Sequence, residues 1–210
     1  VSDLSPGARV LDCGAAFGFL MEVAAEMGFD PYGIERATDA AEHIGERFGK
    51  DHVFMGAFEQ ASFSGLEPRP FDLVCMFDFL EHVRNPLATL HKAADLLAPG
   101  GHLLITTPAS DSLSCYLMGA SWLHFKLEHL YYFNRRNVAQ LLTAANFHPV
   151  QFRSARKIMN LEYVSHQLNT YRRAGLTGTI KFIRSVLPQS VRGSHFPVVF
   201  GEMLVHARRA

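Results

Sequence analysis

Short apolar runs alternate with amphipathic stretches along most of the chain. The apolar runs predict strands, and the stretches in which apolar residues recur every three or four positions predict helices. The expected strands are residues 9–14, 30–35, 52–55, 71–77 and 101–108, followed late in the chain by 149–157 and 197–209. The expected helices are residues 19–28, 38–49, 85–98 and 134–147.

Residues typical of helix ends flank these helices. Thr38 and Asn134 are expected to cap helix N-termini, because short polar side chains accept hydrogen bonds from the first free backbone N–H groups. Gly28 and Gly49 are expected to end helices, and Pro86 suits a first helical turn. Continuous apolar strands separated by helices are typical of a parallel sheet covered on both faces. The pattern therefore predicts a doubly wound α/β fold.

Composition sets the broad class of the protein. The chain has 210 residues, 48% of them hydrophobic and 19% charged, which excludes a disordered chain and predicts one domain over 1–210. We expect a cofactor-binding core over about 5–108. Lid or acceptor-side insertions are expected at about 109–133, which is rich in aromatic residues, and at about 158–190, which is basic.

The same composition bears on the compartment. No apolar run approaches the ~18 residues of a membrane span, and no basic-then-apolar N-terminus suggests a secretory signal. Three scattered cysteines are too few for a disulfide framework. The sequence therefore predicts a cytoplasmic protein with no transmembrane segment.

The turn after the first expected strand is the first chemical signal. Its glycines, Gly14 and Gly18, do not have the G-x-G-x-x-G spacing of a dinucleotide site. Asp12 places a carboxylate at the strand end, where it would repel a pyrophosphate and attract a cationic ligand. A second interpretation is that Asp12 only braces the turn by accepting backbone hydrogen bonds.

Several motifs in order resemble a known family. They are VLDCGAAFG (10–18), YGIE (32–35), FDLV (71–74) with FLEHVRNP (79–86), LAPGGHLLITTP (97–108) and EHLYYF (128–133). On these motifs the chain is identified as a member of the S-adenosylmethionine-dependent methyltransferases with a Rossmann-like fold. It is similar to the small-molecule type that includes the quinone-biosynthesis O-methyltransferases. The resemblance implies a seven-stranded sheet, mostly parallel, with the last strand antiparallel and helices on both faces.

The resemblance also implies where S-adenosylmethionine binds. Glu35, at the end of the second strand, would accept hydrogen bonds from the ribose hydroxyls. Family members often carry an aspartate for the adenine amino group where this chain has Ala57, so Phe58 would supply apolar contact instead. The expected cofactor-binding residues are Asp12, Cys13, Gly14, Ala15, Ala16, Gly18, Glu35, Arg36, Ala57, Phe58, Phe77 and Asp78.

A titratable cluster follows the fourth strand. Glu81 and His82, together with His129, are the expected catalytic groups, and with Asp78 they resemble the D/E-x-x-E-H arrangement of quinone-biosynthesis and small-RNA 2′-O-methyltransferases. If residues 78–82 were helical, three of these side chains would share one face. Three interpretations remain open: a structural pair, a metal-free general base at His82, and a divalent metal held by all four.

The predicted activity is methyl transfer from S-adenosylmethionine to a small-molecule acceptor, at a hydroxyl group. The alternatives are a non-catalytic S-adenosylmethionine-binding regulatory protein and a nicotinamide oxidoreductase. Residues 1–100 hold 16 acidic and 7 basic residues, and 101–210 hold 4 and 13, although the net charge is zero. Either the halves interleave, or the basic half receives an anionic or carrier-linked acceptor or touches a membrane surface. The zero net charge argues against a nucleic-acid partner, and no oligomeric state is predicted.

Overall fold

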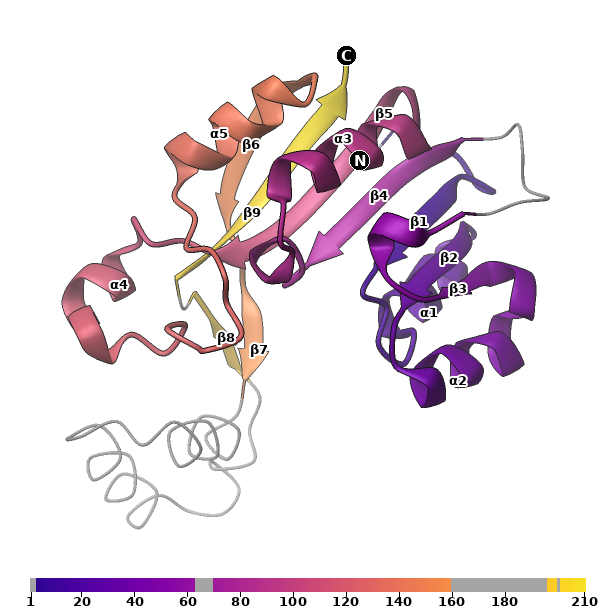
Figure 1. Ribbon diagram of the computed structural model, residues 1–210, viewed down its shortest axis with the longest axis horizontal. Coiled ribbons are helices and arrows are strands. Elements are labelled where there is room, and N and C mark those ends of the chain that lie inside the picture. Colours follow the sequence, from indigo (N-terminus) through magenta and orange to yellow (C-terminus); the bar gives the residue numbers. More distant parts are fainter. Residues whose placement is uncertain (1–2, 63–69, 160–195, 200) are drawn as a thin grey trace, which may run out of the picture.

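A seven-stranded sheet forms the centre of the computed structural model, which describes residues 3–62, 70–159, 196–199 and 201–210 (Figure 1). The strands are β1 (Arg9–Cys13), β2 (Asp30–Glu35), β3 (Val53–Met55), β4 (Phe71–Phe77), β5 (Leu97–Pro108), β6 (Phe147–Ser154), β7 (Lys157–Met159), β8 (Phe196–Val198) and β9 (Glu202–Arg209). The α-helices are α1 (Phe19–Glu26), α2 (Thr38–Phe48), α3 (Pro86–Leu96), α4 (Leu113–Met118) and α5 (Arg135–Ala144). Short 3₁₀ turns are η1 (Lys50–His52), η2 (Phe58–Gln60), η3 (Leu80–His82) and η4 (Gly119–Ser121).

The order of strands across the sheet is β3-β2-β1-β4-β5-β9-β6. The first five are parallel, and β9 lies antiparallel between β5 and β6. The predicted seven-stranded, mostly parallel fold with an antiparallel last strand is therefore confirmed. Since β1 has β2 on one side and β4 on the other, the chain reverses direction across the sheet at β1, which is where doubly wound folds bind ligands.

Helices cover both faces of the sheet. On one face, Leu90 of α3 and Val138 of α5 pack with Leu103, Ile105 and other buried residues of the strands. The opposite face near β1 is covered by α1 and α2, whose buried side chains include Met21, Ala24 and Ile44. Both faces of the sheet are therefore shielded from water. This is why the strands are continuous runs of apolar residues and do not alternate apolar with polar positions.

Several helix-end predictions hold in detail. Asn134 caps α5 in a reciprocal arrangement in which its side chain and that of Asn137 each accept a backbone hydrogen bond. Pro86 is the first residue of α3, capped by the side chain of Asn85. The prediction for Thr38 is wrong, because Ala37 occupies the N-cap position of α2 and makes no side-chain bond. The first free N–H groups there face Glu35, whose carboxylate accepts from Ala37.

Two late strands differ from expectation. The predicted strand 149–157 begins earlier, at Phe147, and ends at Ser154, and Lys157 opens the separate strand β7. The predicted strand 197–209 is divided into β8, which pairs with β7 in a small second sheet, and β9. Gly201, with φ of 88°, precedes β9, and only glycine readily adopts this conformation.

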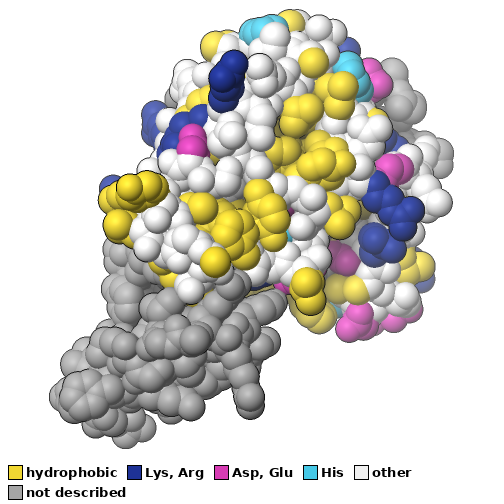
Figure 2. Space-filling view, turned by 60° about the vertical axis from the view of Figure 1, so that its left-hand side comes forward, with side chains coloured by type: hydrophobic (Ala, Val, Ile, Leu, Met, Phe, Trp, Pro, Cys, Tyr) yellow, Lys and Arg dark blue, Asp and Glu magenta, His cyan; other side chains and the backbone are white. Residues whose placement is uncertain are grey.

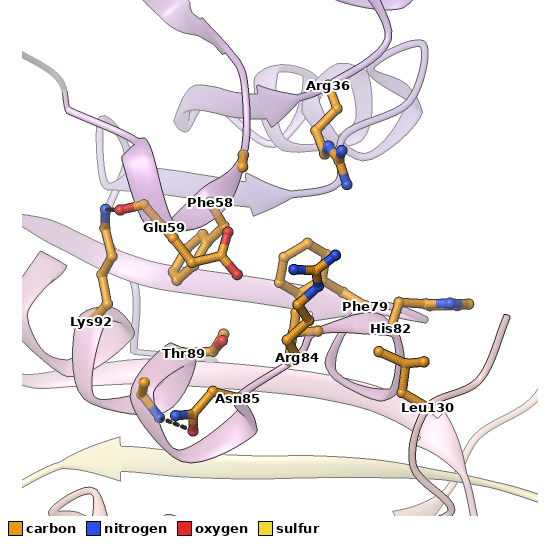
Figure 3. A pocket seen from close by; sticks show the side chains of 13 residues that line it. Arg36, Phe58, Glu59, Phe79, His82, Arg84, Asn85, Thr89, Lys92 and Leu130 are labelled. Atoms are coloured by element: carbon orange, nitrogen blue, oxygen red, sulfur yellow. Dashed lines mark hydrogen bonds between the residues drawn. The ribbon is translucent and has the colours of Figure 1, made fainter.

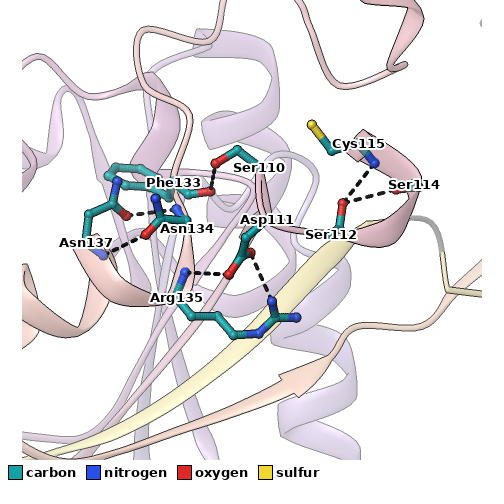
Figure 4. Close-up of polar contacts among 9 residues, drawn as sticks. All are labelled: Ser110, Asp111, Ser112, Ser114, Cys115, Phe133, Asn134, Arg135 and Asn137. Atoms are coloured by element: carbon teal, nitrogen blue, oxygen red, sulfur yellow. Dashed lines mark hydrogen bonds and ion pairs between the residues drawn. The ribbon is translucent and has the colours of Figure 1, made fainter. Parts of the chain in front are cut away.

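The first expected insertion, 109–133, leaves the sheet after β5 and contains α4 and η4 within irregular chain. Polar contacts tie its two ends together (Figure 4). The Ser110 hydroxyl donates to the carbonyl of Phe133, and the carboxylate of Asp111 lies 3.0 Å from the guanidinium of Arg135. The second expected insertion, 158–190, lies almost entirely outside the described residues.

Charged side chains of both signs are mixed with apolar groups on the face drawn in Figure 2. On that face, the mixing fits the interpretation in which the acidic first half and the basic second half of the chain interleave in the fold. The helices of the described residues include none long and apolar enough to cross a membrane.

Candidate functional site

The turn between β1 and α1 is shaped by three residues in left-handed conformation. Gly14 and Gly18 have φ of 79° and 80°, and Ala16 between them has φ of 46°. The backbone N–H groups of Gly14 and Ala15 both donate to the carbonyl of Ile34, which joins the turn to the end of β2. The turn is therefore a rigid, narrow bend with its backbone exposed toward the carboxyl edge of the sheet.

Two carboxylates lie at this edge. Asp12 is only 6% exposed, and burial raises the pKa of Asp12 to about 7, with the negative charge of Glu35 adding to the shift. Glu35 accepts backbone hydrogen bonds from Ala16 of the turn and from Arg36 and Ala37 beyond β2. The carboxylate that braces the turn is thus Glu35, while Asp12 is a buried acid that a cationic ligand would stabilise in its charged form.

Some of the other expected cofactor-binding residues could contact the cofactor only through backbone atoms, and others could use their side chains. The side chains of Cys13 and Ala15 are buried in the core, so these residues can offer a ligand only their backbone. Burial raises the pKa of the Cys13 thiol well above its usual value, which keeps the thiol protonated and unreactive. Phe77 packs against the core beneath α1, and Asp78 after it is exposed, with φ of 50°.

A cleft of about 820 Å³ opens beside these turns. Arg36, Ala57 and Phe58 line it, as expected for residues near a cofactor. In Figure 3 the side chains of Arg36 and Arg84 reach into it from opposite walls. The complete lining is Arg36, Ala57, Phe58, Glu59, Phe79, His82, Val83, Arg84, Asn85, Ala88, Thr89, Lys92 and Leu130.

The sequence did not predict that Phe79 and Lys92 line this cleft. The ring of Phe79 packs edge to face on Phe58, with centroids 5.7 Å apart, and lies 3.1 Å from where a side chain on Gly14 would begin. Lys92 donates to the carbonyls of Glu59 and Ala61 and so holds the η2 turn against α3. Only the apolar character of Phe79 beside the E-H pair could have indicated its place.

The three expected catalytic side chains meet beside the cleft, and His82 among them lines it. One ligand atom each from Glu81, His82 and His129 lies within 4.8 Å of the others. The rings of His82 and His129 meet edge to face with centroids 4.8 Å apart. Burial raises the pKa of Glu81 to about 7 and lowers the pKa of His129. The cluster therefore combines a buried acid with two imidazoles, one buried and one exposed.

Backbone contacts hold this cluster together. Nδ1 of His82 lies 2.9 Å from the carbonyl of Glu128, and the backbone N–H of Leu130 donates to the carbonyl of Glu81. Because a carbonyl only accepts, Nδ1 of His82 must carry the proton, which leaves Nε2 of the neutral ring as an acceptor or ligand. The segment after α4 is thus fastened to η3, although about 46 residues of sequence separate the two.

Asp78 is not brought into this group. The expected helix over 78–82 is absent, because only the 3₁₀ turn η3 forms after the left-handed residue Asp78. Thr106 of β5 contacts Asp78 instead, and its hydroxyl lies 3.4 Å from the carboxylate. The metal set expected from the sequence is therefore reduced to three residues in the structure.

The residues present fit the groups that the resemblance implies. For S-adenosylmethionine, a buried carboxylate faces an exposed backbone turn beside an open cleft. For a divalent metal, both oxygens of Glu81 and Nδ1 of His129 are buried and without a hydrogen-bond partner in the described part of the chain. Such atoms are costly unless a ligand or ion satisfies them.

A family model described as a methyltransferase domain matches residues 1–151 of the chain. The chain belongs to this family. The identification as an S-adenosylmethionine-dependent methyltransferase, made from the motifs above, is confirmed.

Curated relatives carry a more specific name. A ubiquinone biosynthesis O-methyltransferase of Xanthomonas campestris is 33% identical over 125 residues, which cover 56% of this chain and 51% of the relative. One of Photobacterium profundum is 36% identical over 106 residues, covering 48% and 44%. The chain spans about half the length of these curated relatives. The methyltransferase is thus similar to the quinone-biosynthesis type.

Solved structures show the same fold at low sequence identity. A Bacillus halodurans methyltransferase matches with a TM-score of 0.63 and 15% identity, covering 99% of this chain and 94% of that one. A Haemonchus contortus phosphoethanolamine N-methyltransferase, solved with S-adenosylhomocysteine, has a TM-score of 0.59 and 18% identity, covering 98% and 49%.

Proposed function

We propose that this methyltransferase transfers the methyl group of S-adenosylmethionine to a hydroxyl group of a small-molecule acceptor, within a single domain over 1–210. The observation that carries the proposal is the cluster of Glu81, His82 and His129, in which His82 lines the cleft. A hydroxyl must lose its proton to become a good nucleophile, and this cluster offers groups able to take it.

The cofactor, when bound, supplies an electrophilic methyl group on a sulfonium. Asp12 and the backbone of the Gly14–Gly18 turn bind its charged amino acid part, and Glu35 orients the ribose. The aromatic wall formed by Phe58 and Phe79 excludes water from the cleft. These residues fix the direction of the methyl group, and alignment of this kind supplies much of the rate in a displacement reaction.

The proton of the acceptor hydroxyl goes to His82 in this proposal. Its Nδ1 is occupied by the carbonyl of Glu128, so Nε2 is the basic atom. Glu81 and His129 lie against this ring and would hold the acceptor in place. A divalent metal, if present, would be held by Glu81, His82 and His129, and would lower the pKa of a bound hydroxyl.

The curated relatives are named for ubiquinone biosynthesis, which favours an acceptor hydroxyl on a ring that is converted to a quinone. An anionic or carrier-linked form of such an acceptor suits the basic second half of the chain. We therefore propose phenolic hydroxyls, including vicinal pairs, as the first acceptors to test.

The test is a panel of phenols, aliphatic alcohols and amines incubated with S-adenosylmethionine carrying a radiolabelled methyl group. We expect label on phenolic oxygen, and we expect the variant His82→Ala to lose it while an exposed matched variant, His43→Ala, keeps it. Label on amines alone would contradict the hydroxyl proposal. Metal content and sensitivity to a chelator decide between a metal-assisted and a metal-free base, because only the former loses activity on chelation.

The non-catalytic alternative predicts cofactor binding without transfer to any member of the panel. The oxidoreductase alternative predicts binding of NADH and none of S-adenosylmethionine. Label on any acceptor excludes both, and the family match gives neither any support.

A further inference from the structure

A second buried acid lies outside the groups used so far. Glu202, the first residue of β9, is only 5% exposed, and its carboxylate lies 3.7 Å from Nδ1 of the half-buried His124. Burying a carboxylate is costly, and pairing it with an imidazole offsets part of that cost. The pair joins the last strand of the sheet to the irregular segment that follows α4.

Glu202 is held rigidly on the sheet side. Its backbone is in register with Pro108 at the end of β5, and its carbonyl accepts from Ala155 beyond β6. Gly201 before it packs so closely that a side chain there would begin 2.1 Å from the hydroxyl oxygen of Ser114. The carboxylate therefore projects from a fixed point.

His124 is fixed on its other side by a buried aromatic residue. Trp122 is fully buried, and its ring meets that of His124 edge to face with centroids 5.0 Å apart. Its Nε1–H donates to the hydroxyl of Ser114 in α4. The imidazole of His124 is thus held between the Trp122 ring and the carboxylate of Glu202.

The contacts continue from His124 to the catalytic cluster. The backbone N–H of Phe125 donates to the carbonyl of Trp122, and the backbone N–H of His129 donates to the carbonyl of Lys126. Residues 122–125 and 126–129 therefore form two consecutive turns, and the side chain of His129 at the end of the second meets that of His82. Displacement of His124 would carry the His129 ring away from His82 and Glu81.

We infer that Glu202 and His124 form a positioning pair that sets the place of the His129 ring in the acceptor site. The pair touches neither cofactor nor reacting atoms and acts through His129. This inference rests on the proposed function for the importance of the cluster, but the placement of the His129 ring is measurable without any acceptor.

The experiment compares Glu202→Ala, Glu202→Gln and His124→Phe in the full chain. The readout is the imidazole NMR signal of His129, assigned with His129→Ala. We expect a clear change of this signal in Glu202→Ala and His124→Phe, and recovery in Glu202→Gln, whose side chain has the same size and still places an oxygen beside the ring. Affinity for S-adenosylmethionine should stay within about twofold, because Asp12 and Glu35 lie on other strands.

The matched control is Asp111→Asn, which breaks an exposed ion pair of the same segment with Arg135 (Figure 4). It should leave the His129 signal in place. An unchanged signal in His124→Phe overturns the inference, even if Glu202→Ala does not fold. An equal change in Asp111→Asn also overturns it, because any loosening of the segment would then suffice.

With an acceptor from the panel, the effect on kcat gives a second readout. Glu202→Ala should lower kcat about tenfold in the parent chain and have little further effect when His129 is already alanine. Additive losses would contradict action through His129. If the panel shows no transfer to hydroxyls while the His129 signal moves as expected, the proposed function fails and the positioning pair stands.

Discussion

The proposed cofactor side and the proposed acceptor side of this methyltransferase are built in different ways. Residues 9–37 form the cofactor side from consecutive elements, and Glu35 is satisfied there by three backbone N–H groups. The acceptor side brings Glu81 and His129 together across a long stretch of sequence, and among the described residues both carboxylate oxygens of Glu81 and Nδ1 of His129 have no hydrogen-bond partner. The carboxylate of Glu35 is satisfied within the protein, whereas the carboxylate of Glu81 is left for what binds there.

This difference indicates how each region is stabilised before and after a ligand binds. A turn held by its own backbone is stable before any ligand binds, so it can be preformed for the cofactor. A buried cluster with unsatisfied atoms destabilises the folded protein until substrate or metal enters, as is common in catalytic sites. The four predictions below test this division in order of effect.

The largest effect is expected for Glu81→Gln. Removal of the carboxylate should lower transfer to the acceptor about 100-fold, because Glu81 holds the acceptor in place for attack and misplacement of a reactant can cost this much. Stability should be kept or raised, because a neutral amide is cheaper to bury than an unpaired acid. Rates of label transfer and denaturant unfolding measure the two.

The exposed neighbour Glu128 provides the control for Glu81. Glu128→Gln removes a carboxylate that lies 4.0 Å from Lys126 at the surface, and both rate and stability should change little. Loss of stability in Glu81→Gln together with an unchanged rate would assign Glu81 to the structural interpretation.

Asp12→Asn should weaken cofactor binding about 10- to 100-fold at pH 8, because a buried partner of a cation is lost. Since the pKa of Asp12 is raised to about 7, protons compete with the cofactor below that pH. The affinity of the parent protein should therefore fall toward tenfold per pH unit below 7, and this slope should be absent in Asp12→Asn. Calorimetric titration from pH 5.5 to 8.5 measures both.

The same group affects the stability of the cofactor-free protein with a defined sign. Its folded pKa of about 7 lies above the usual value of 3.8, so the folded state binds more protons between these values. Stability should fall as pH rises from about 4 to 7, and Asp12→Asn should remove part of this fall. A stability that rises over this window in the parent and not in the variant would contradict the shift.

Gly33→Ala tests the packing beneath the cofactor turn. A side chain on Gly33 would begin 2.8 Å from the sulfur of Met21 and 3.0 Å from the Cβ of Ala15. We expect a loss of about 1–3 kcal/mol in unfolding free energy. Gly45→Ala in α2 is the matched control, because it meets only ordinary contacts and should stabilise the helix by up to ~1 kcal/mol. Equal changes in unfolding free energy in the two variants would contradict the conclusion that close packing at Gly33 excludes a side chain.

The smallest effect is expected for Ala16→Gly. Glycine relieves the left-handed strain at φ of 46°, but it also gives the unfolded chain more freedom. The two effects nearly cancel, so stability should change by less than ~1 kcal/mol and cofactor affinity by less than about threefold. Gly14→Ala should be clearly worse, since Phe79 is only 3.1 Å away. A large gain from Ala16→Gly would show that the turn is strained rather than preformed.

The sequence predicted the fold well because its signals are local. The order of strands and helices, the cap at Asn134 and the exposed turn at Gly14 all follow from residues within a few positions of one another. Asp78 shows the limit, since its separation from Glu81 arises from a left-handed backbone and a bond to Thr106 on another strand. Glu202 is a second example of this limit, because the residues next to it in the sequence give no indication that it contacts His124.

The place of β9 in the sheet has a consequence for how the molecule is made. A ribosome synthesises β9 after both of its neighbours, yet β9 fills the gap between β5 and β6. Until then those strands have unpaired edges, which are prone to pair with other chains. The sheet therefore cannot form completely until β9, which carries Glu202, has been synthesised. Insertion of β9 between β5 and β6 also brings Glu202 to the acceptor side.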